Sequence, residues 1–212
     1  MKPEIDYSLY LVTDRRLMST STLEEAVGQA IAGGVTLVQL REKDASSLEF
    51  YEMAVKVKQV TDRHNIPLII DDRADIAAAV DAAGVHVGQS DIPARRVRSV
   101  IGKDKILGVS ASTLDEAVQA QRDGADYLGV GAMFATKTKT DATVVSMEEL
   151  KKIREAVSLP IVAIGGINGK MLPLLEGTGI DGVAVVSALM ASNSITAEAE
   201  KLKRAVLRIK RT

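Results

Sequence analysis

The feature that most constrains the fold is a series of eight short apolar runs, rich in β-branched residues, that recurs along the whole chain. They read SLYLVT, TLVQLR, PLIID, GVHVG, KILGVSA, YLGVGA, PIVAIG and GVAVVS. Because each run is nearly continuous in apolar character, we expect both faces of each strand to be covered, as in a parallel sheet beneath helices. Eight strands alternating with helices predict a (β/α)₈ barrel, with a doubly wound open sheet as the alternative.

The segments between the runs carry start and stop signals for helices. Four hydroxyl residues are each followed three positions later by glutamate, which is the pattern of a capping box. These residues are Thr22, Ser46, Thr113 and Ser146. A weak repeat predicts a helix end just before a strand at four glycines, Gly34, Gly84, Gly124 and Gly179. The final stretch, AEKLKRAVLRIKRT, is expected to form a closing helix.

Length and composition favour one domain over residues 1–212. The chain has 212 residues, near the lower limit for a complete barrel, and 46% of them are hydrophobic, which suffices for a core. The net charge of −1 with interspersed signs argues against nucleic acid or a membrane surface as a general partner. Cysteine is absent, which removes disulfides and thiolate chemistry. With no apolar run long enough to span a membrane and no leader-like start, a cytoplasmic protein is expected.

Polar residues at the end of the second run are the first candidates for a functional site, because barrels carry their sites at the C-terminal ends of the strands. In VQLREK, the period of two places Gln39, Arg41 and Lys43 on one side of the chain. That arrangement is unusual for a buried strand unless the three side chains point into the barrel mouth. An ion pair between Arg41 and Glu42 is the structural alternative.

Carboxylates follow the next two runs. Asp71 and Asp72 come at the end of the third run, and Asp91 follows the fourth. Carboxylates opposite two lysines and an arginine indicate a divalent cation held together with a phosphorylated ligand, since Mg²⁺ prefers a few carboxylates, water and phosphate oxygens. For Asp72, a helix N-cap is the competing interpretation.

Two further stretches are typical of anion sites. The segment GAMFATKTKTDA after the sixth run is either a solvated loop or a phosphate site built from hydroxyls, ammonium groups and N–H groups. The seventh and eighth runs end in Gly165-Gly166-Ile167 and Val186-Ser187-Ala188. Loops after these two strands commonly bind phosphate, so we expect a second anion site distinct from the one near Arg41.

The two histidines contribute little to this hypothesis. His64 follows a helical segment and is expected to be exposed, whereas His86 lies within the fourth run and is expected to be a hydrogen-bonded core residue rather than a base. No nucleophile, base and orienting group stand out together. The predicted site is rich in charge and poor in general bases.

The order of the motifs VQLREK, DDRADIA, GVHVGQSD, GVSAST, GVGAMFATKTK, AIGGI and VAVVSALM resembles the thiamine phosphate synthase family over nearly the whole chain. The resemblance implies a (β/α)₈ barrel that joins hydroxymethylpyrimidine diphosphate to a thiazole phosphate and releases pyrophosphate, with Mg²⁺ as cofactor. It also implies ionisation of the pyrimidine substrate to a methyl cation before the thiazole nitrogen attacks. Such chemistry requires electrostatic stabilisation of the leaving group and exclusion of water.

The resemblance also implies roles for individual residues. The pyrimidine diphosphate would be bound by Gln39, Leu40, Arg41, Glu42, Lys43, Asp71, Ser110 and Lys139. Of these, the expected catalytic residues are Arg41, Lys43, Ser110 and Lys139. The metal would be held by Asp72 and Asp91. The thiazole phosphate would be bound by Thr136, Lys137, Thr138, Gly166, Val186 and Ser187.

Two positions depart from the family pattern, which usually has asparagine where this chain has Asp71 and proline where it has Ala132. Asp71 adds a negative charge beside a diphosphate, which weakens binding unless a metal or a proton neutralises it. One alternative is therefore a non-catalytic phosphate-binding barrel. The other is a thiazole tautomerase-like isomerase, because that related barrel shares the REK and GGI signatures. The expected partners are the small-molecule substrates, with neither nucleic acid nor membrane, and the sequence leaves open whether copies of the chain assemble into a homo-oligomer.

Overall fold

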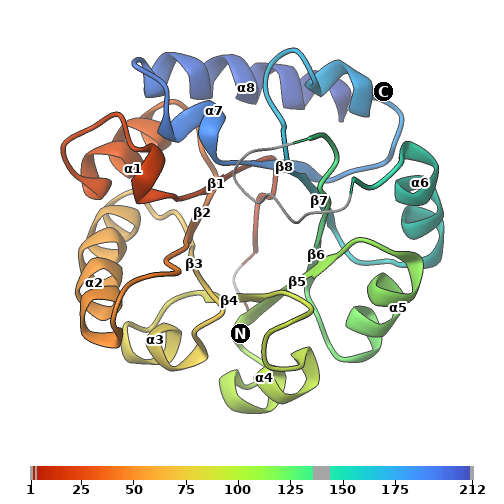
Figure 1. The fold of residues 1–212 in the computed structure, drawn as a ribbon, viewed down its shortest axis with the longest axis horizontal. Coiled ribbons are helices and arrows are strands. Elements are labelled where there is room, and N and C mark those ends of the chain that lie inside the picture. The colour runs from red at the N-terminus through yellow and green to blue at the C-terminus, as the bar shows by residue number, and fades with distance from the viewer. Residues whose placement is uncertain (1, 3, 136–143, 211–212) are drawn as a thin grey trace.

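The structure is a computed structural model that describes residues 2, 4–135 and 144–210. Its strands form one closed parallel barrel in the order of the sequence, with the eighth strand pairing back to the first (Figure 1). The strands are β1 (Leu9–Val12), β2 (Leu37–Leu40), β3 (Leu68–Asp71), β4 (Gly84–Val87), β5 (Ile106–Ala111), β6 (Tyr127–Val130), β7 (Ile161–Ile164) and β8 (Gly182–Val185). The predicted (β/α)₈ barrel is confirmed, and the open sheet is excluded.

Helices surround the barrel on its outer side (Figure 1). They are α1 (Leu23–Ala32), α2 (Ser47–Arg63), α3 (Ala74–Ala79), α4 (Ala94–Ile101), α5 (Leu114–Arg122), α6 (Met147–Ala156), α7 (Ser187–Met190) and α8 (Ile195–Ile209). Two short 3₁₀ helices, η1 (Arg15–Leu17) and η2 (Leu172–Leu175), lie after β1 and between β7 and β8. The predicted closing helix is confirmed as α8, which packs against α1 and so completes the ring of helices.

The hydrophobic core has two parts, which explains why the strands are apolar on both faces. One part lies between the barrel and the helices, and includes Leu11 of β1 and Leu40 of β2. The other fills the barrel interior, and includes Tyr10, Leu37 and Tyr127. Alternate residues of each strand thus point outward to the helices and inward to the barrel centre.

The four predicted N-caps are confirmed, because each hydroxyl accepts from the backbone N–H of the glutamate three residues later. The reciprocal bond of a full capping box forms at Ser46, where Glu49 accepts from the N–H of Ser46. Elsewhere the glutamates take other partners. Glu116 accepts from Ser112, and Glu149 accepts from the N–H of Leu114, which ties the start of α6 to the start of α5.

Three of the four predicted helix-ending glycines, Gly34, Gly124 and Gly179, have the positive φ angles expected of that role. The prediction was wrong for Gly84, which is the first residue of β4. Its small size is needed for strand packing instead, since a Cβ there would lie 2.1 Å from the carbonyl oxygen of Ile106 in β5.

The segment before β1 crosses the centre of the ring in the view of Figure 1. Ile5 and Tyr7 pack against the interior core, and the N–H of Val183 donates to the carbonyl oxygen of Ser8. This segment covers the N-terminal end of the barrel, so the interior opens at the opposite end, where the strands finish.

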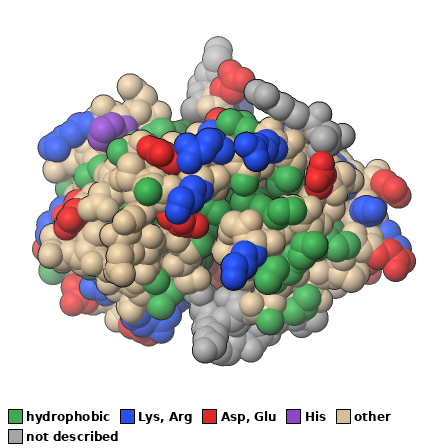
Figure 2. Space-filling model, turned by 90° about the horizontal axis from the view of Figure 1, so that it is seen from above, with side chains coloured by type: hydrophobic (Ala, Val, Ile, Leu, Met, Phe, Trp, Pro, Cys, Tyr) green, Lys and Arg blue, Asp and Glu red, His purple; other side chains and the backbone are tan. Residues whose placement is uncertain are grey.

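Charges of both signs are mixed on the surface face that Figure 2 shows from above. On the face shown in Figure 2, Lys and Arg side chains are interspersed with Asp and Glu, and hydrophobic side chains lie between them. Among the described residues, the structure contains no helix that is both long and apolar enough to cross a bilayer.

Two glycine variants test the packing of the barrel. We expect Gly182→Ala to lower the free energy of unfolding by about 1–3 kcal/mol or more, because the new Cβ would lie 1.7 Å from the carbonyl oxygen of Tyr7 and force the backbone to shift. Gly28→Ala within α1 has room, with Val60 at 3.9 Å as its nearest neighbour, and should raise that free energy by about 0.5–1 kcal/mol. Urea unfolding of both variants measures the difference, and equal midpoints would contradict this packing.

Candidate active site

A pocket of about 700 Å³ opens at the C-terminal end of the barrel and is lined by residues from all eight strands or the segments that follow them. Most of the predicted site residues in the described part of the chain line it. These are Gln39, Arg41, Lys43, Asp71, Asp72, Asp91, Ser110, Gly166, Val186 and Ser187. Closure of the barrel brings together side chains that lie far apart in the sequence, from Gln39 to Ser187.

Two predicted residues have their side chains elsewhere. Leu40 points outward and is buried in the core between the barrel and the helices. Glu42 lies on the same outward phase, and its carboxylate accepts from Nε of Arg15 at 2.8 Å, beside a shallow pocket of about 170 Å³. The period of two along the chain from β2 explains both placements. The alternative of an ion pair between Arg41 and Glu42 is wrong, because Glu42 pairs with Arg15.

Four further predicted residues, Thr136, Lys137, Thr138 and Lys139, lie outside the described residues. The segments that flank them approach the pocket, since Ala132 lines it and the N–H of Val145 donates to the carbonyl oxygen of Ala132.

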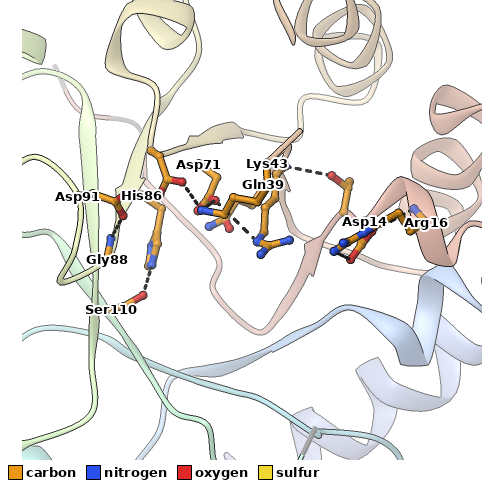
Figure 3. Close-up of polar contacts among 12 residues, drawn as sticks. Asp14, Arg16, Gln39, Lys43, Asp71, His86, Gly88, Asp91 and Ser110 are labelled. Atoms are coloured by element: carbon orange, nitrogen blue, oxygen red, sulfur yellow. Dashed lines mark hydrogen bonds and ion pairs between the residues drawn. The ribbon is translucent and has the colours of Figure 1, made fainter. Parts of the chain in front are cut away.

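A cluster of opposite charges lies at one side of the pocket (Figure 3). Nζ of Lys43 is 3.2 Å from Oδ2 of Asp71 and also donates to Oδ2 of Asp72. Nε of Arg41 is 3.8 Å from the same Asp71 oxygen. The end of β2 thus supplies the cations and the end of β3 supplies the carboxylates, as neighbouring parallel strands allow.

Asp71 is the most deeply buried member of the cluster, and its Oδ2 makes ion pairs but no well-directed hydrogen bond within the described residues. Burial raises the pKa of Asp71 above its usual range, although Lys43 and Arg41 act in the opposite direction. Burial also acts to lower the pKa of Lys43, but Asp71 and Asp72 outweigh it and raise that pKa. The cations at this mouth are therefore held in place by carboxylates.

Asp72 and Asp91 face each other across the ends of β3 and β4. The N-cap interpretation of Asp72 is wrong: Arg73 occupies the N-cap of α3, and Asp72 has a φ of 59° that turns its side chain toward Lys43. Oδ2 of Asp91 accepts from the N–H of Gly88 at 2.7 Å (Figure 3). Burial and the neighbouring Asp72 raise the pKa of Asp91 despite the bond from Gly88.

A chain of hydrogen bonds crosses the floor of the pocket. His86 Nε2 is 2.9 Å from Oγ of Ser110, and His86 Nδ1 is 2.9 Å from the hydroxyl of Tyr127 (Figure 3 shows the first bond). The Tyr127 hydroxyl is 2.8 Å from that of Tyr10, which accepts from Nε2 of Gln39 at 2.9 Å. His86 is thus a buried, hydrogen-bonded residue as predicted, and His64 is exposed at the end of α2.

Sequence reasoning missed Tyr10 and Tyr127, both of which line the pocket. A signal was present in the sequence, because each tyrosine lies within an apolar strand on the inward phase. From the sequence alone, a tyrosine at such a position cannot be told apart from an aromatic residue that only packs in the core.

The opposite side of the pocket is formed by the ends of β7 and β8. Gly165 and Gly166 have φ angles of 95° and 67°, and a Cβ on Gly166 would lie 2.8 Å from Ala135 O. Only glycine allows the backbone to approach the segment after β6 this closely. Ser187 follows β8 as the first residue of α7 and lines the same side.

A closed parallel barrel with a charged pocket at the C-terminal ends of its strands defines the class of (β/α)₈ proteins, whose enzymes carry their active sites at this end. A family model described as Thiamine monophosphate synthase matches residues 9–189. The chain therefore belongs to the thiamine-phosphate synthase family, and it is a transferase.

Individual relatives agree with this assignment. Thiamine-phosphate synthase of Clostridium beijerinckii is 66% identical over 99% of this chain and 100% of its own length. The enzyme of the same name from Ruminiclostridium cellulolyticum is 63% identical over 95% of this chain and 96% of its own. The solved structure of thiamine phosphate pyrophosphorylase from Pyrococcus furiosus superposes with a TM-score of 0.89 at 40% identity, covering 96% of this chain and 97% of that one.

The raised pKa of Asp71 predicts how its replacement changes stability with pH. An acid whose pKa is higher in the folded state stabilises the fold most below its unfolded pKa of about 3.9, and that contribution is lost as pH rises. Asparagine does not titrate, so Asp71→Asn should gain stability relative to the parent as pH rises from about 4 to 7. Urea unfolding at both pH values, in chelator, measures this change.

Asp75→Asn provides the matched control. The bond from Arg73 lowers the pKa of the exposed Asp75, so the stability that this carboxylate contributes changes mainly below its unfolded pKa of about 3.9. The effect of replacing Asp75 should therefore stay nearly constant over the interval in which Asp71→Asn gains stability. A gain for Asp71→Asn that did not grow with pH would contradict the burial of a charged carboxylate.

Proposed function

We propose that this chain joins hydroxymethylpyrimidine diphosphate to a thiazole phosphate, forming thiamine phosphate and pyrophosphate. The observation that carries the proposal is the pairing of Arg41 and Lys43 with the buried carboxylate of Asp71 at the mouth of a pocket large enough for two small substrates. Family membership supports the choice of substrates. A cytoplasmic location remains our expectation from the sequence.

The diphosphate would bind on the β2 side of the pocket. Lys43 and Arg41 would exchange part of their interaction with Asp71 for phosphate oxygens, because a diphosphate offers more acceptors and more charge than one carboxylate. Ser110 would donate from the floor of the pocket. The resemblance adds Lys139, which lies outside the described residues, to the groups that bind this ligand. Leu40 and Glu42, whose side chains point away, would contribute only through their main chain.

Asp72 and Asp91 are suited to hold Mg²⁺. The two carboxylates face each other, and their mutual repulsion contributes to the raised pKa of Asp91. A bound cation would relieve this repulsion. Among the residues that the structure describes, no three His, Cys, Asp or Glu side chains are grouped so that they could hold a metal ion together. Water and the diphosphate would supply the remaining oxygen ligands, as is usual for Mg²⁺. When bound, Mg²⁺ would neutralise charge on the leaving pyrophosphate.

The thiazole phosphate would bind opposite, at the ends of β7 and β8. The close backbone at Gly166 and the positions of Val186 and Ser187 support a phosphate pocket at the place where (β/α)₈ barrels commonly have one. The resemblance assigns the same phosphate to Thr136, Lys137 and Thr138, which lie outside the described residues. The two substrates would thus meet over the barrel centre.

In the proposed reaction, the bond between the pyrimidine methylene carbon and the diphosphate oxygen breaks first, and the electron pair leaves with the diphosphate. The resulting cation is stabilised by the electron-rich aminopyrimidine, and the lone pair of the thiazole nitrogen then forms the new C–N bond. Arg41 and Lys43 would stabilise the charge of the leaving group, while the enclosed pocket limits capture of the cation by water. The step requires no general base.

The direct test is incubation of the purified chain with both substrates and Mg²⁺, with the products quantified by chromatography. We expect thiamine phosphate and pyrophosphate in equal amounts. Conversion of a thiazole substrate alone would favour the isomerase alternative, and binding of both phosphates without product would favour a non-catalytic barrel. Either result would overturn the proposal.

We expect Asp91→Asn to lose about 10–100-fold or more in rate while retaining the fold, because it removes one of two carboxylates proposed to hold the cation. Excess chelator should abolish the activity of the parent chain. Asp81→Asn is the control, since Asp81 pairs with Lys105 before β4, at the other end of the barrel. Full activity in chelator, or equal losses in the two variants, would contradict a metal role for Asp91.

Substitutions on opposite sides of the pocket should separate the two substrates. Arg41→Gln should raise the KM for the pyrimidine diphosphate, and Ser187→Ala should raise the KM for the thiazole phosphate, each by roughly tenfold for one lost phosphate contact. Steady-state kinetics with one substrate saturating measures each KM. The assignment of two sides is wrong if both variants affect the same substrate.

A further inference from the structure

The hydrogen-bonded chain beneath the pocket can run in only one direction. It begins at Gln39, whose amide nitrogen Nε2 can donate but cannot accept, and which lies 2.9 Å from the hydroxyl oxygen of Tyr10. Tyr10 and Tyr127, the two tyrosines that belong to this series of hydrogen bonds, are fully buried. A buried hydroxyl that does not donate its hydrogen loses a hydrogen bond that water would otherwise provide.

The direction of each later bond follows from the first. Within the described residues, the hydroxyl of Tyr10 has only Gln39 and Tyr127 as partners, so its hydrogen must point to Tyr127, at 2.8 Å. The hydroxyl of Tyr127 then accepts from Tyr10, and its own hydrogen must point to Nδ1 of His86, at 2.9 Å. Reversing the chain would leave the hydroxyl hydrogen of Tyr10 buried without an acceptor.

The remaining steps reach the pocket. Because Nδ1 of His86 accepts, the neutral imidazole carries its proton on Nε2, which lies 2.9 Å from Oγ of Ser110 and donates to it. Burial raises the pKa of Tyr10 and of Tyr127 far above the usual value, so both hydroxyls keep the hydrogens that the chain requires. Ser110 is partly exposed to the pocket and, in the described part of the chain, Oγ has no hydrogen-bond partner other than His86.

We infer that Tyr10, Tyr127 and His86 are positioning residues that fix the hydroxyl of Ser110 as a hydrogen-bond donor toward the pocket. With Oγ accepting from His86, the hydrogen of Ser110 is left to point at a ligand. The group that it recognises must be an acceptor, such as a diphosphate oxygen or an unprotonated ring nitrogen of the pyrimidine. This identification of the ligand rests on the proposed function, whereas the direction of the chain does not.

The tautomer of His86 tests the direction without any substrate. The chain contains two histidines, so nitrogen-15 spectra of histidine-labelled protein hold two ring systems, and the exposed His64 is assigned with His64→Gln. At neutral pH we expect His86 to be a neutral ring with the proton on Nε2. A proton on Nδ1, or protonation of both nitrogens, would reverse the chain and overturn the inference even if the enzyme is active.

Kinetics of Tyr127→Phe test the link from the chain to the ligand. This variant removes the donor to Nδ1, so His86 should populate both tautomers, and the KM for the pyrimidine diphosphate should rise by roughly tenfold, equivalent to one hydrogen bond of ordinary net strength. The KM for the thiazole phosphate should stay the same. Tyr7→Phe is the matched control, because the Tyr7 ring packs 5.0 Å from that of Tyr127 while its hydroxyl is not part of the chain.

The two measurements separate the possible failures. A mixed tautomer with both KM values unchanged would show that the chain does not act through Ser110. Loss of stability in Tyr127→Phe without a change of tautomer would indicate a purely structural role, and would also contradict the inference. If the parent enzyme has no activity, the proposed function fails, and the tautomer of His86 alone decides the direction of the chain.

Discussion

Closure of the barrel by the pairing of β8 with β1 is the constraint on which the rest of the structure depends. Because all eight strands are parallel, closure brings their C-terminal ends to a single rim. The segment before β1 covers the other end, so polar groups inside the barrel can meet a ligand only at this rim. Residues as distant in sequence as Gln39 and Ser187 therefore line one pocket.

The rim concentrates charge that the fold must neutralise before any ligand is bound. Asp71 is buried beside Lys43 and Arg41, and these ion pairs hold both cations at the mouth. The cost of burying the Asp71 carboxylate appears in its raised pKa. A diphosphate would compete with Asp71 for the same cations, so this residue would lower affinity for the anion while it positions the cations. Asparagine at this position would position the cations less strongly but would not repel the ligand.

The fold could be predicted from the sequence because its signals are local and repeated. Each strand is an apolar run, and the N-caps at Ser46 and Ser146 depend on residues three positions apart. The period of two along β2 correctly predicted that the side chains of Gln39, Arg41 and Lys43 face the pocket. By the same period, the side chains of Leu40 and Glu42 face outward, so their predicted place in the site rested on the resemblance alone. The ion-pair partner of each charged residue was harder to predict, since Glu42 pairs with Arg15 rather than with the adjacent Arg41.

The floor of the site could not be read from the sequence for a physical reason. Tyr10 and Tyr127 are separated by 117 positions, and their hydroxyls meet only because β1 and β6 face each other across a closed barrel. Nothing local distinguishes such tyrosines from apolar core residues. His86 was expected to be hydrogen-bonded, but its partners, and hence the proton it carries, required the three-dimensional arrangement.

The central claim is that the charges gathered at this rim hold a diphosphate. A crystal structure of the chain grown with pyrophosphate and Mg²⁺ tests that claim most directly. The account predicts pyrophosphate against Arg41 and Lys43, with the cation between it and the carboxylates of Asp72 and Asp91. Pyrophosphate bound only in the shallow pocket beside Arg15 and Arg16, with the Lys43 and Asp71 pair undisturbed, would contradict it.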